Sequence, residues 1–320
     1  MERQNQSMHR SQGSTLMRQE ALQAPEAVAR FLGSDAPEEL HRLAQQLCVQ
    51  PPHDIVTLGR GTSDHAAYFL AYRIMLKLGR PVSSLPPSLF TMHQARLAHQ
   101  RSLALVFSQS GQSPDLVEAA QHYTAAGADS VAFVNANHSP LADAARWVIP
   151  LHAGDEKSVA ATKSYIAELV AGVLLLAHWQ CDKEMLEALQ DLPGALHEAT
   201  ERNWESALAR LSAVDRLLVV ARGACASVGL EAALKLKEIC GIQAEFVSGA
   251  EIRHGPMALV RAGYPVLVLA PRGPEQAGLI QLAQDLRAAE ARVVMVGADG
   301  LEQADLHYPC SPHTELDPLC

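Results

Sequence analysis

The feature that most constrains the fold of this 320-residue chain is an internal repeat. Three segments of the first half recur in the second half at a constant offset of 162 positions: "TLGRGTS" from Thr57 and "VVARGAC" from Val219, "LALVFSQSG" from Leu103 and "PVLVLAPRG" from Pro265, and "VAFVNA" from Val131 and "VVMVGA" from Val293. Each segment joins an apolar run to a loop of small or polar residues. Three such units in register, without a gap, predict a tandem duplication of one domain.

The apolar runs predict strands of a parallel sheet. They are continuous rather than alternating, as expected for strands that are covered on both faces. The predicted strands span residues 54–58, 103–107, 130–134, 216–220, 265–269 and 292–296. Helical patterns fill the intervals, and this alternation is typical of a doubly wound α/β fold.

The repeat also predicts how the chain is divided. We expect a helical or flexible N-terminal segment over 1–35, a first domain over 36–181, a helical connector over 182–211 and a second domain over 212–320. The connector is expected to be helical because its apolar residues recur at helical spacing. A chain of this length is long enough for two domains of ordinary size.

Charge and composition exclude several classes of function. The chain is 48% hydrophobic and 19% charged, with a formal net charge of −9 and scattered basic residues, so neither a nucleic-acid surface nor a membrane surface is expected. The N-terminus lacks the apolar core of a secretory signal, and the longest apolar run, Leu169 to Trp179, is too short to span a bilayer. The six cysteines form no C-x-x-C pair and the histidines no H-E-x-x-H motif. We therefore expect a cytoplasmic protein without a metal site.

A loop rich in hydroxyl groups follows the predicted strand at 103–107. Its polar residues are Ser108, Gln109, Ser110 and Ser113. The loop turns at Gly111, and a helix is expected to begin at Ser113 or Pro114, where backbone N–H groups are free. Serine hydroxyls beside such a helix start form an uncharged phosphate cradle, although a plain capped turn is the alternative. The matching loop of the second half, "APRGPEQAG", has lost the serines, so only one copy is expected to bind an oxyanion.

A second loop, "GRGTSD" from Gly59 to Asp64, also follows a strand and opens a helix. It resembles the start of a dinucleotide-binding G-x-G-x-x-G motif, but Asp64 replaces the third glycine, and no acid follows at the expected distance. We therefore expect no NAD or FAD and no other cofactor. The small glycines instead let a ligand approach the backbone, where Thr62 and Ser63 offer hydroxyl groups.

A helix in the second half carries a possible acid–base face. Glu231, Lys235 and Glu238 lie at positions i, i+4 and i+7 and therefore share one helical face. One interpretation is a solvated stripe whose ion pairs are worth about 0.3 kcal/mol each. The other is a catalytic carboxyl with a cation beside it. "EIRHGP", further along, presents His254 at a Gly-Pro break, either as a surface histidine at a helix end or as a proton donor.

Taken together, these motifs resemble the SIS (sugar isomerase) family. The closest resemblance within it is to the isomerase half of glutamine–fructose-6-phosphate aminotransferases and to stand-alone amino-sugar-phosphate deaminases. The matching motifs, in order, are "RGTS", "SQSGQSPD", "SVAATKSY", "EAALKLKE" and "EIRHGPMAL", and the resemblance covers roughly residues 30–320. It implies two flavodoxin-like SIS domains in tandem, each a mostly parallel sheet covered by helices on both faces, and a homodimer with shared active sites.

The resemblance also implies roles for particular residues. The phosphate loop falls on Ser108, Gln109, Ser110 and Ser113, and sugar contacts fall on Thr62, Ser63 and the backbone of Val159 and Ala160. Glu238 takes the position of the base that moves a proton between C1 and C2, and Lys235 contacts the sugar one turn earlier. His254 takes the position of the ring-opening histidine, which the family supplies from the neighbouring subunit. Aldose–ketose isomerisation requires such a carboxyl base and an open-chain substrate.

The sequence departs from the family pattern at both ends. It shows no N-terminal glutaminase domain, so the chain is expected to use free ammonia or to run in the deaminating direction. It also stops at Cys320, before the basic tail that covers the sugar in relatives. The expected activity is deamination of glucosamine 6-phosphate to fructose 6-phosphate and ammonia. The alternatives are a galactosamine 6-phosphate or fructosyl-amino-acid 6-phosphate enzyme and a non-catalytic sugar-phosphate sensor.

Overall fold

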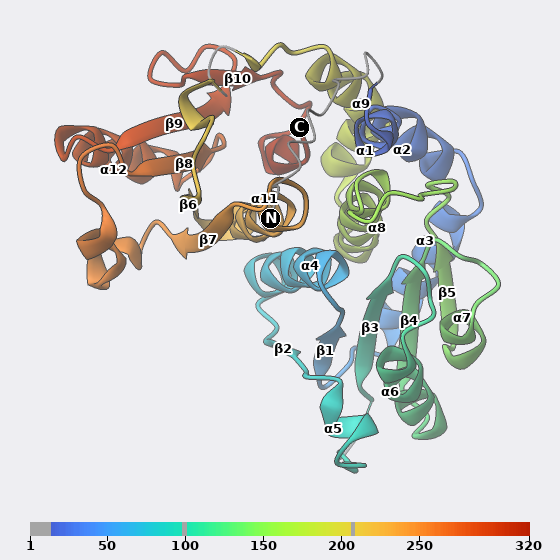
Figure 1. The fold of residues 1–320 in the computed structure, drawn as a ribbon. Helices are drawn as coiled ribbons and strands as arrows, with labels where there is room; N and C mark the ends of the chain where they lie inside the picture. The colour runs from blue at the N-terminus through green and yellow to red at the C-terminus, as the bar shows by residue number, and fades with distance from the viewer. Residues whose placement is uncertain (1–13, 98–100, 206–208) are drawn as a thin grey trace, which may run out of the picture.

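The computed structural model describes residues 14–97, 101–205 and 209–320, and it shows two α/β domains side by side (Figure 1). The expected N-terminal segment and connector therefore lie partly outside the described residues, at 1–13 and 206–208. The first domain occupies the blue and green part of the figure, and the second domain the orange and red part. Helices α4 and α11 face each other where the two domains meet.

The first domain is built on a five-stranded parallel sheet in the order β2-β1-β3-β4-β5. Its strands are β1 (Ile55–Leu58), β2 (Val82–Ser84), β3 (Leu103–Ser108), β4 (Asp129–Val134) and β5 (Trp147–Pro150). Its helices are α1 (Leu16–Ala21), α2 (Ala24–Leu32), α3 (Ala36–Val49), α4 (Thr62–Leu78), α5 (Ser88–Thr91), α6 (Pro114–Ala125), α7 (Pro140–Ala144) and α8 (Lys163–Gln180).

Both faces of this sheet are apolar, which explains the continuous runs in the sequence. Phe107 and Phe133 stack on one face with ring centroids 4.4 Å apart, in a core shared with α2, α3, α4 and α8. Val106 and Ala132 point to the opposite face, where Tyr123 of α6 completes a second core. Because the side chains of each strand alternate between two buried faces, polar and apolar residues do not alternate along its sequence.

The second domain repeats this topology in the order β10-β9-β8-β6-β7. Its strands are β6 (Arg216–Ala221), β7 (Gln243–Ser248), β8 (Pro265–Ala270), β9 (Arg292–Ala298) and β10 (Leu306–Tyr308). Its α-helices are α11 (Ala226–Cys240) and α12 (Gln276–Ala288), and α9 (Lys183–Thr200) precedes it. Short 3₁₀ turns complete it: η1 (Ala209–Leu211), η2 (Gly223–Cys225), η3 (Ile252–His254), η4 (Pro256–Leu259) and η5 (Thr314–Leu319).

The two sheets confirm the duplication. Strands β3 and β8 begin and end 162 positions apart, and the order of strands along the two sheets is the same. Helix α12 covers one face of the second sheet and α11 covers β6 and β7 on the other. The two tandem α/β domains expected from the sequence are therefore present, each with a parallel sheet between helices.

Helix α8 connects the two halves of the structure. It packs against α2, α3 and α4, and Tyr165 near its start reaches the second domain, where its hydroxyl lies 3.1 Å from Ser227 Oγ on α11. Ser227 Oγ in turn donates to the carbonyl oxygen of His65 on α4 at 2.6 Å. Tyr165 and Ser227 are buried, so these polar contacts between α4, α8 and α11 lie inside the boundary between the two domains.

Candidate functional site

The loop between β1 and α4 brings hydroxyl groups to the carboxyl edge of the first sheet. A side chain at Gly59 would put its Cβ 2.6 Å from the backbone nitrogen of Asp64, so the tight turn requires glycine there. Helix α4 then begins at Thr62, and the side chains of Thr62 and Ser63 lie at its first turn. Ser63 is buried and Thr62 is half-buried.

The loop between β3 and α6 folds back on itself through its serines. Ser108 Oγ accepts from the backbone N–H of Gly111 at 3.0 Å, and Ser110 Oγ accepts from that of Gln112 at 3.3 Å. Each hydroxyl therefore keeps its own hydrogen for a ligand oxygen. Gly111 has φ of 63°, and a Cβ there would collide with the side chain of Ser139. Glycine is thus needed for both the turn and the close approach.

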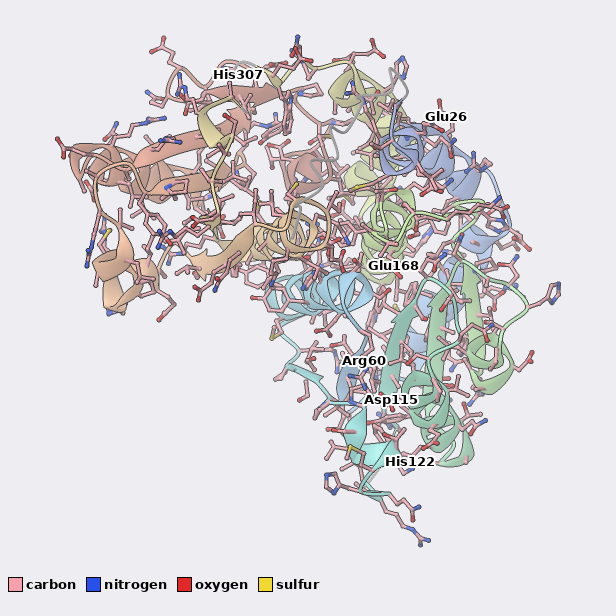
Figure 2. The ribbon with its side chains drawn as sticks, viewed as in Figure 1. Glu26, Arg60, Asp115, His122, Glu168 and His307 are labelled. Atoms are coloured by element: carbon pink, nitrogen blue, oxygen red, sulfur yellow. The ribbon has the colours of Figure 1, made fainter. Side chains whose placement is uncertain are left out.

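The remaining polar residues of this loop differ in their contacts and exposure. Ser113 stands at the N-cap position of α6, as expected, but its side chain makes no capping hydrogen bond. Gln109 is half-buried and Ser110 is exposed. An ion pair between Arg60 and Asp115 joins the two hydroxyl loops, and Figure 2 shows these two labelled side chains next to one another.

A third loop, which leads into α8, is held by two carboxyls. Glu20 of α1 accepts from the backbone N–H groups of Lys157 at 2.6 Å and Ser158 at 3.0 Å. Glu156 Oε1 accepts from the backbone N–H groups of residues 162 and 164, at the start of α8. Between these anchors, Val159 is 98% exposed while Ala160 is buried. Val159 is therefore open to contact from outside, whereas Ala160 is covered.

A cluster of charged side chains lies where α11 meets α4. Lys235 Nζ lies 2.9 Å from Thr62 Oγ1, 2.9 Å from Glu238 Oε2 and 3.0 Å from Glu231 Oε1. The Thr62 hydroxyl also donates to Glu231 Oε1 at 3.0 Å, and His65 Nδ1 lies 2.7 Å from Glu231 Oε2. The helical face predicted from the sequence thus forms: its Glu231 and Lys235 contact Thr62 of the other domain, while Glu238 is exposed.

Electrostatics explain how Glu231 is tolerated at this depth. Burial raises the pKa of its carboxyl, but the hydrogen bond from His65 and the charge of Lys235 lower it, and the net result is a pKa below its ordinary value. An ionised Glu231 then holds the ammonium group of Lys235 in place through an ion pair. The Lys235 side chain is 15% exposed and that of Glu238 is 34% exposed, so Glu238 is the member of the cluster that reaches the open side.

His254 is not part of this cluster. It ends the 3₁₀ turn η3, its side chain is exposed, and its backbone N–H donates to the carbonyl oxygen of Glu251 at 2.8 Å. In Figure 1 the orange segment after β7 lies at the far side of the second domain from α4. Within the described residues, no hydrogen bond or ion pair joins His254 to Glu238 or Lys235.

Sequence reasoning missed three carboxyl or imidazole groups of this region. His65 follows Thr62 by one helical turn, so the two share a face of α4, but only the packing of α4 on α11 places that face beside Glu231. Glu156 precedes α8 and caps it, which only the folded loop shows. Glu168 is the one acid in the apolar helix α8, and such an isolated acid is a usable signal of a buried polar contact. Among the residues that the structure describes, no group of three His, Cys, Asp or Glu side chains is placed to hold a metal ion.

Comparison with known proteins shows the family to which this architecture belongs. The model of the SIS domain family matches residues 50–178 and 210–303. Glutamine–fructose-6-phosphate aminotransferase (isomerizing) from Methanothermobacter thermautotrophicus is 32% identical over 262 residues, covering 81% of this chain and 43% of that protein. The chain spans about half the length of the curated relatives it matches.

Solved structures show the same relationship. A candidate phosphosugar isomerase from Silicibacter pomeroyi DSS-3 superposes with a TM-score of 0.89 at 38% identity, covering 96% of this chain and 93% of that one. Glucosamine-6-phosphate deaminase from Thermotoga maritima superposes with a TM-score of 0.67 at 21% identity, covering 92% and 90%, which shows a shared fold alone.

The fold and the charged cluster define a two-domain α/β protein with polar loops at the carboxyl edge of one sheet and acid–base groups at the domain boundary. The chain belongs to the SIS domain family, in the branch of the phosphosugar isomerases. Over the described parts of the chain, none of the helices is long and apolar enough to cross a membrane.

Proposed function

We propose that the chain isomerises an amino-sugar 6-phosphate, and specifically that it deaminates glucosamine 6-phosphate to fructose 6-phosphate and ammonia. The observation that carries the proposal is the position of Lys235, whose ammonium group bridges Glu238 of the second domain and Thr62 of the first. This bridge brings the carboxylate of Glu238, the proposed base, to the hydroxyl loop in which a sugar could lie. A sensor has no need of such a base.

The reaction can be written for these residues. In the open-chain amino sugar, the Glu238 carboxylate removes the proton from C2, the electron pair moves into the C1–C2 bond, and the aldehyde oxygen takes a proton from water as an enol forms. Return of the proton to C1 leaves an imine at C2, which water hydrolyses to the ketone and ammonia. Lys235, a fixed cation beside the base, stabilises the negative charge that develops on the enol oxygen.

Three loops would hold the phosphate and the sugar. Ser108 and Ser110 keep their hydroxyl hydrogens free, and the start of α6 adds backbone N–H groups, so an anion can bind without a cation in the loop. Gln109 and Ser113 complete the proposed phosphate loop. Thr62 and Ser63 would contact the sugar from one side, and the backbone of Val159 and Ala160, of which Val159 is exposed and Ala160 buried, from the other.

We further propose that two chains share each site in a homodimer. The ring-opening step requires a group that protonates the ring oxygen, and His254 is the residue proposed for it. Its exposed position at the end of η3, without a hydrogen bond or ion pair to its own Glu238 among the described residues, would suit donation into a neighbouring chain. Each site would then combine Glu238 from one chain with His254 from its partner.

The direct test of substrate and reaction uses purified protein with glucosamine 6-phosphate and, separately, galactosamine 6-phosphate. Ammonia and ketose phosphate are measured independently. The proposal predicts equal amounts of both products from glucosamine 6-phosphate. Ketose without ammonia would indicate a simple isomerase. Turnover of galactosamine 6-phosphate alone would move the assignment to that epimer, and no product from either would support the sensor alternative.

The phosphate loop is tested by binding. Changing Ser108 and Ser110 together to Ala removes two hydroxyl donors to a charged group, each worth roughly 1.5–3 kcal/mol. Affinity for fructose 6-phosphate, measured by calorimetry, should fall at least ~100-fold. Ser88→Ala, at the start of α5, is a matched control in which affinity should not change. Unchanged affinity in the double variant would place the phosphate elsewhere.

A further inference from the structure

Glu168 is a buried carboxyl that the reaction above does not use. It lies on α8, is 1% exposed, and Figure 2 shows it at the boundary between α8 and α4. Its Oε1 atom lies 2.8 Å from Ser63 Oγ, whereas its Oε2 atom is buried with no hydrogen-bond partner among the described residues. An acid in this position carries a large desolvation cost when it is ionised.

The surroundings of Glu168 contain little to offset that cost. Burial raises its pKa most, the bond from Ser63 lowers it, and the negative charges of Glu156 and Glu231 raise it again, with a net pKa of about 8. The basic groups nearby are engaged elsewhere: His65 of α4 and Lys235 of α11 contact Glu231. The core that α2 and α3 share with α8 is apolar.

The protonation state of Glu168 decides what Ser63 can offer to a ligand. A carboxylate only accepts, so it takes the single hydroxyl hydrogen of Ser63, and Ser63 can then only accept from a ligand. A protonated carboxyl can donate its own hydrogen to Ser63 Oγ, which frees the Ser63 hydrogen for a ligand oxygen. Ligand oxygens on a sugar phosphate that lack a hydrogen, such as phosphate oxygens and the open-chain carbonyl, require a donor.

We propose that Glu168 is a positioning residue whose protonation sets Ser63 as a hydrogen-bond donor to the bound sugar phosphate. The proposal rests on the proposed function, since it places Ser63 against that ligand. It makes binding and proton uptake linked events: the ligand selects the protonated form, so the site takes up a proton when it fills near pH 8. Apparent affinity then decreases as pH rises, in proportion to the protonated fraction.

The test compares wild type with Glu168→Gln. The glutamine amide can donate to Ser63 at every pH, so the variant mimics the protonated acid without titrating. Calorimetry with fructose 6-phosphate, between pH 7 and pH 9.5 in buffers of different ionisation enthalpy, reports affinity and proton uptake together. For wild type we expect affinity to fall about fivefold between pH 8 and pH 9, with proton uptake on binding. Glu168→Gln should show neither effect.

Two further variants make the comparison specific. Glu26→Gln changes an exposed carboxyl on α2 and should keep the wild-type pH profile. Ser63→Ala removes the group through which Glu168 acts, so it should lower affinity and abolish the pH dependence even with Glu168 present. Ser63→Ala also keeps the proposal testable if Glu168→Gln does not fold.

The outcomes distinguish failure of the proposed function from failure of the role of Glu168. No binding of fructose 6-phosphate to wild type at pH 7 would refute the proposed function. Binding with the same pH slope and the same proton uptake in wild type and Glu168→Gln would refute the role of Glu168 alone. An unchanged slope in Ser63→Ala would likewise show that the linkage does not pass through Ser63.

Discussion

Replacing Lys235 with Met tests whether the two domains are joined through the charged cluster. The change removes the ammonium group and with it the contacts to Thr62, Glu231 and Glu238, while the length of the side chain is roughly kept. An exposed ion pair contributes about 0–1 kcal/mol, whereas removal of one partner of a buried pair costs about 3–5 kcal/mol. Lys235 is mostly buried, but Glu231 keeps its bonds from His65 and Thr62, so we expect a loss of about 2 kcal/mol.

A double-mutant cycle with Thr62→Val isolates the contact between domains. Thr62→Val keeps the shape of the side chain, removes the hydroxyl, and should cost about 1 kcal/mol alone. The double variant should lose about 1 kcal/mol less than the sum of the two single changes, because both remove the same contact. The free energy of unfolding is measured by urea denaturation, with fluorescence and circular dichroism compared so that stepwise unfolding of the domains is detected.

The control for this cycle is Lys237→Met. Lys237 lies on the same helix, is exposed, and its side chain makes no hydrogen bond or ion pair with a described residue. Its change should leave stability within about 0.5 kcal/mol of wild type. If the losses from Lys235→Met and Thr62→Val simply add, the bridge between Lys235 and Thr62 is absent in solution and the geometry of the site is wrong.

Three other predictions concern the loop between β3 and α6, the carboxyl of Glu231 and the homodimer. Gly111→Ala should lower fructose 6-phosphate affinity in calorimetry by more than tenfold because of its φ of 63° and its clash with Ser139, while Gly127→Ala, at φ of 78° in open space, should not. The pKa of Glu231 is lowered in the fold, so the stability that its ionised carboxylate contributes is present above the ordinary pKa of 4.5 and is lost as the pH falls below it. The melting temperature of Glu231→Gln should therefore decrease less than that of wild type as the pH is lowered through this range. Mixing inactive Glu238→Gln and His254→Ala chains should restore up to roughly a quarter of wild-type activity if sites are shared, whereas no recovery despite proven exchange of subunits would place His254 in its own chain's chemistry.

The sequence predicted the centre of each sheet and missed the edges. The buried strands β3, β4, β8 and β9 are continuous apolar runs, and their signal is strong because both faces are covered. Strands β2, β5, β7 and β10 were not predicted. All four are the edge strands of their sheets, and an edge strand keeps polar residues. Strand β7, "QAEFVS", exposes Gln243 and Glu245.

The sequence predicted which residues share a helical face in the candidate site, but not which residues of the other domain they contact. Helical spacing placed Glu231, Lys235 and Glu238 on one face, and the structure confirms that face. Nothing in local pattern indicated that this face meets Thr62, which is 173 positions away from Lys235, since such contacts arise only from the packing of α4 on α11. Glu168 was missed for the same reason: its partner Ser63 lies 105 positions away.

The most direct measurement for the central claim is solvent deuterium incorporation. Wild type and Glu238→Gln are incubated with glucosamine 6-phosphate in D₂O, and deuterium at C1 and C2 of the sugar phosphates is followed by NMR. Glu245→Gln, at an exposed acid of β7, serves as the matched control. We predict that deuterium enters at least ~100-fold more slowly with Glu238→Gln than with wild type or the control, because the base is lost while the shape is kept. Incorporation at the wild-type rate in Glu238→Gln would contradict the assignment of the base and of the site built around it.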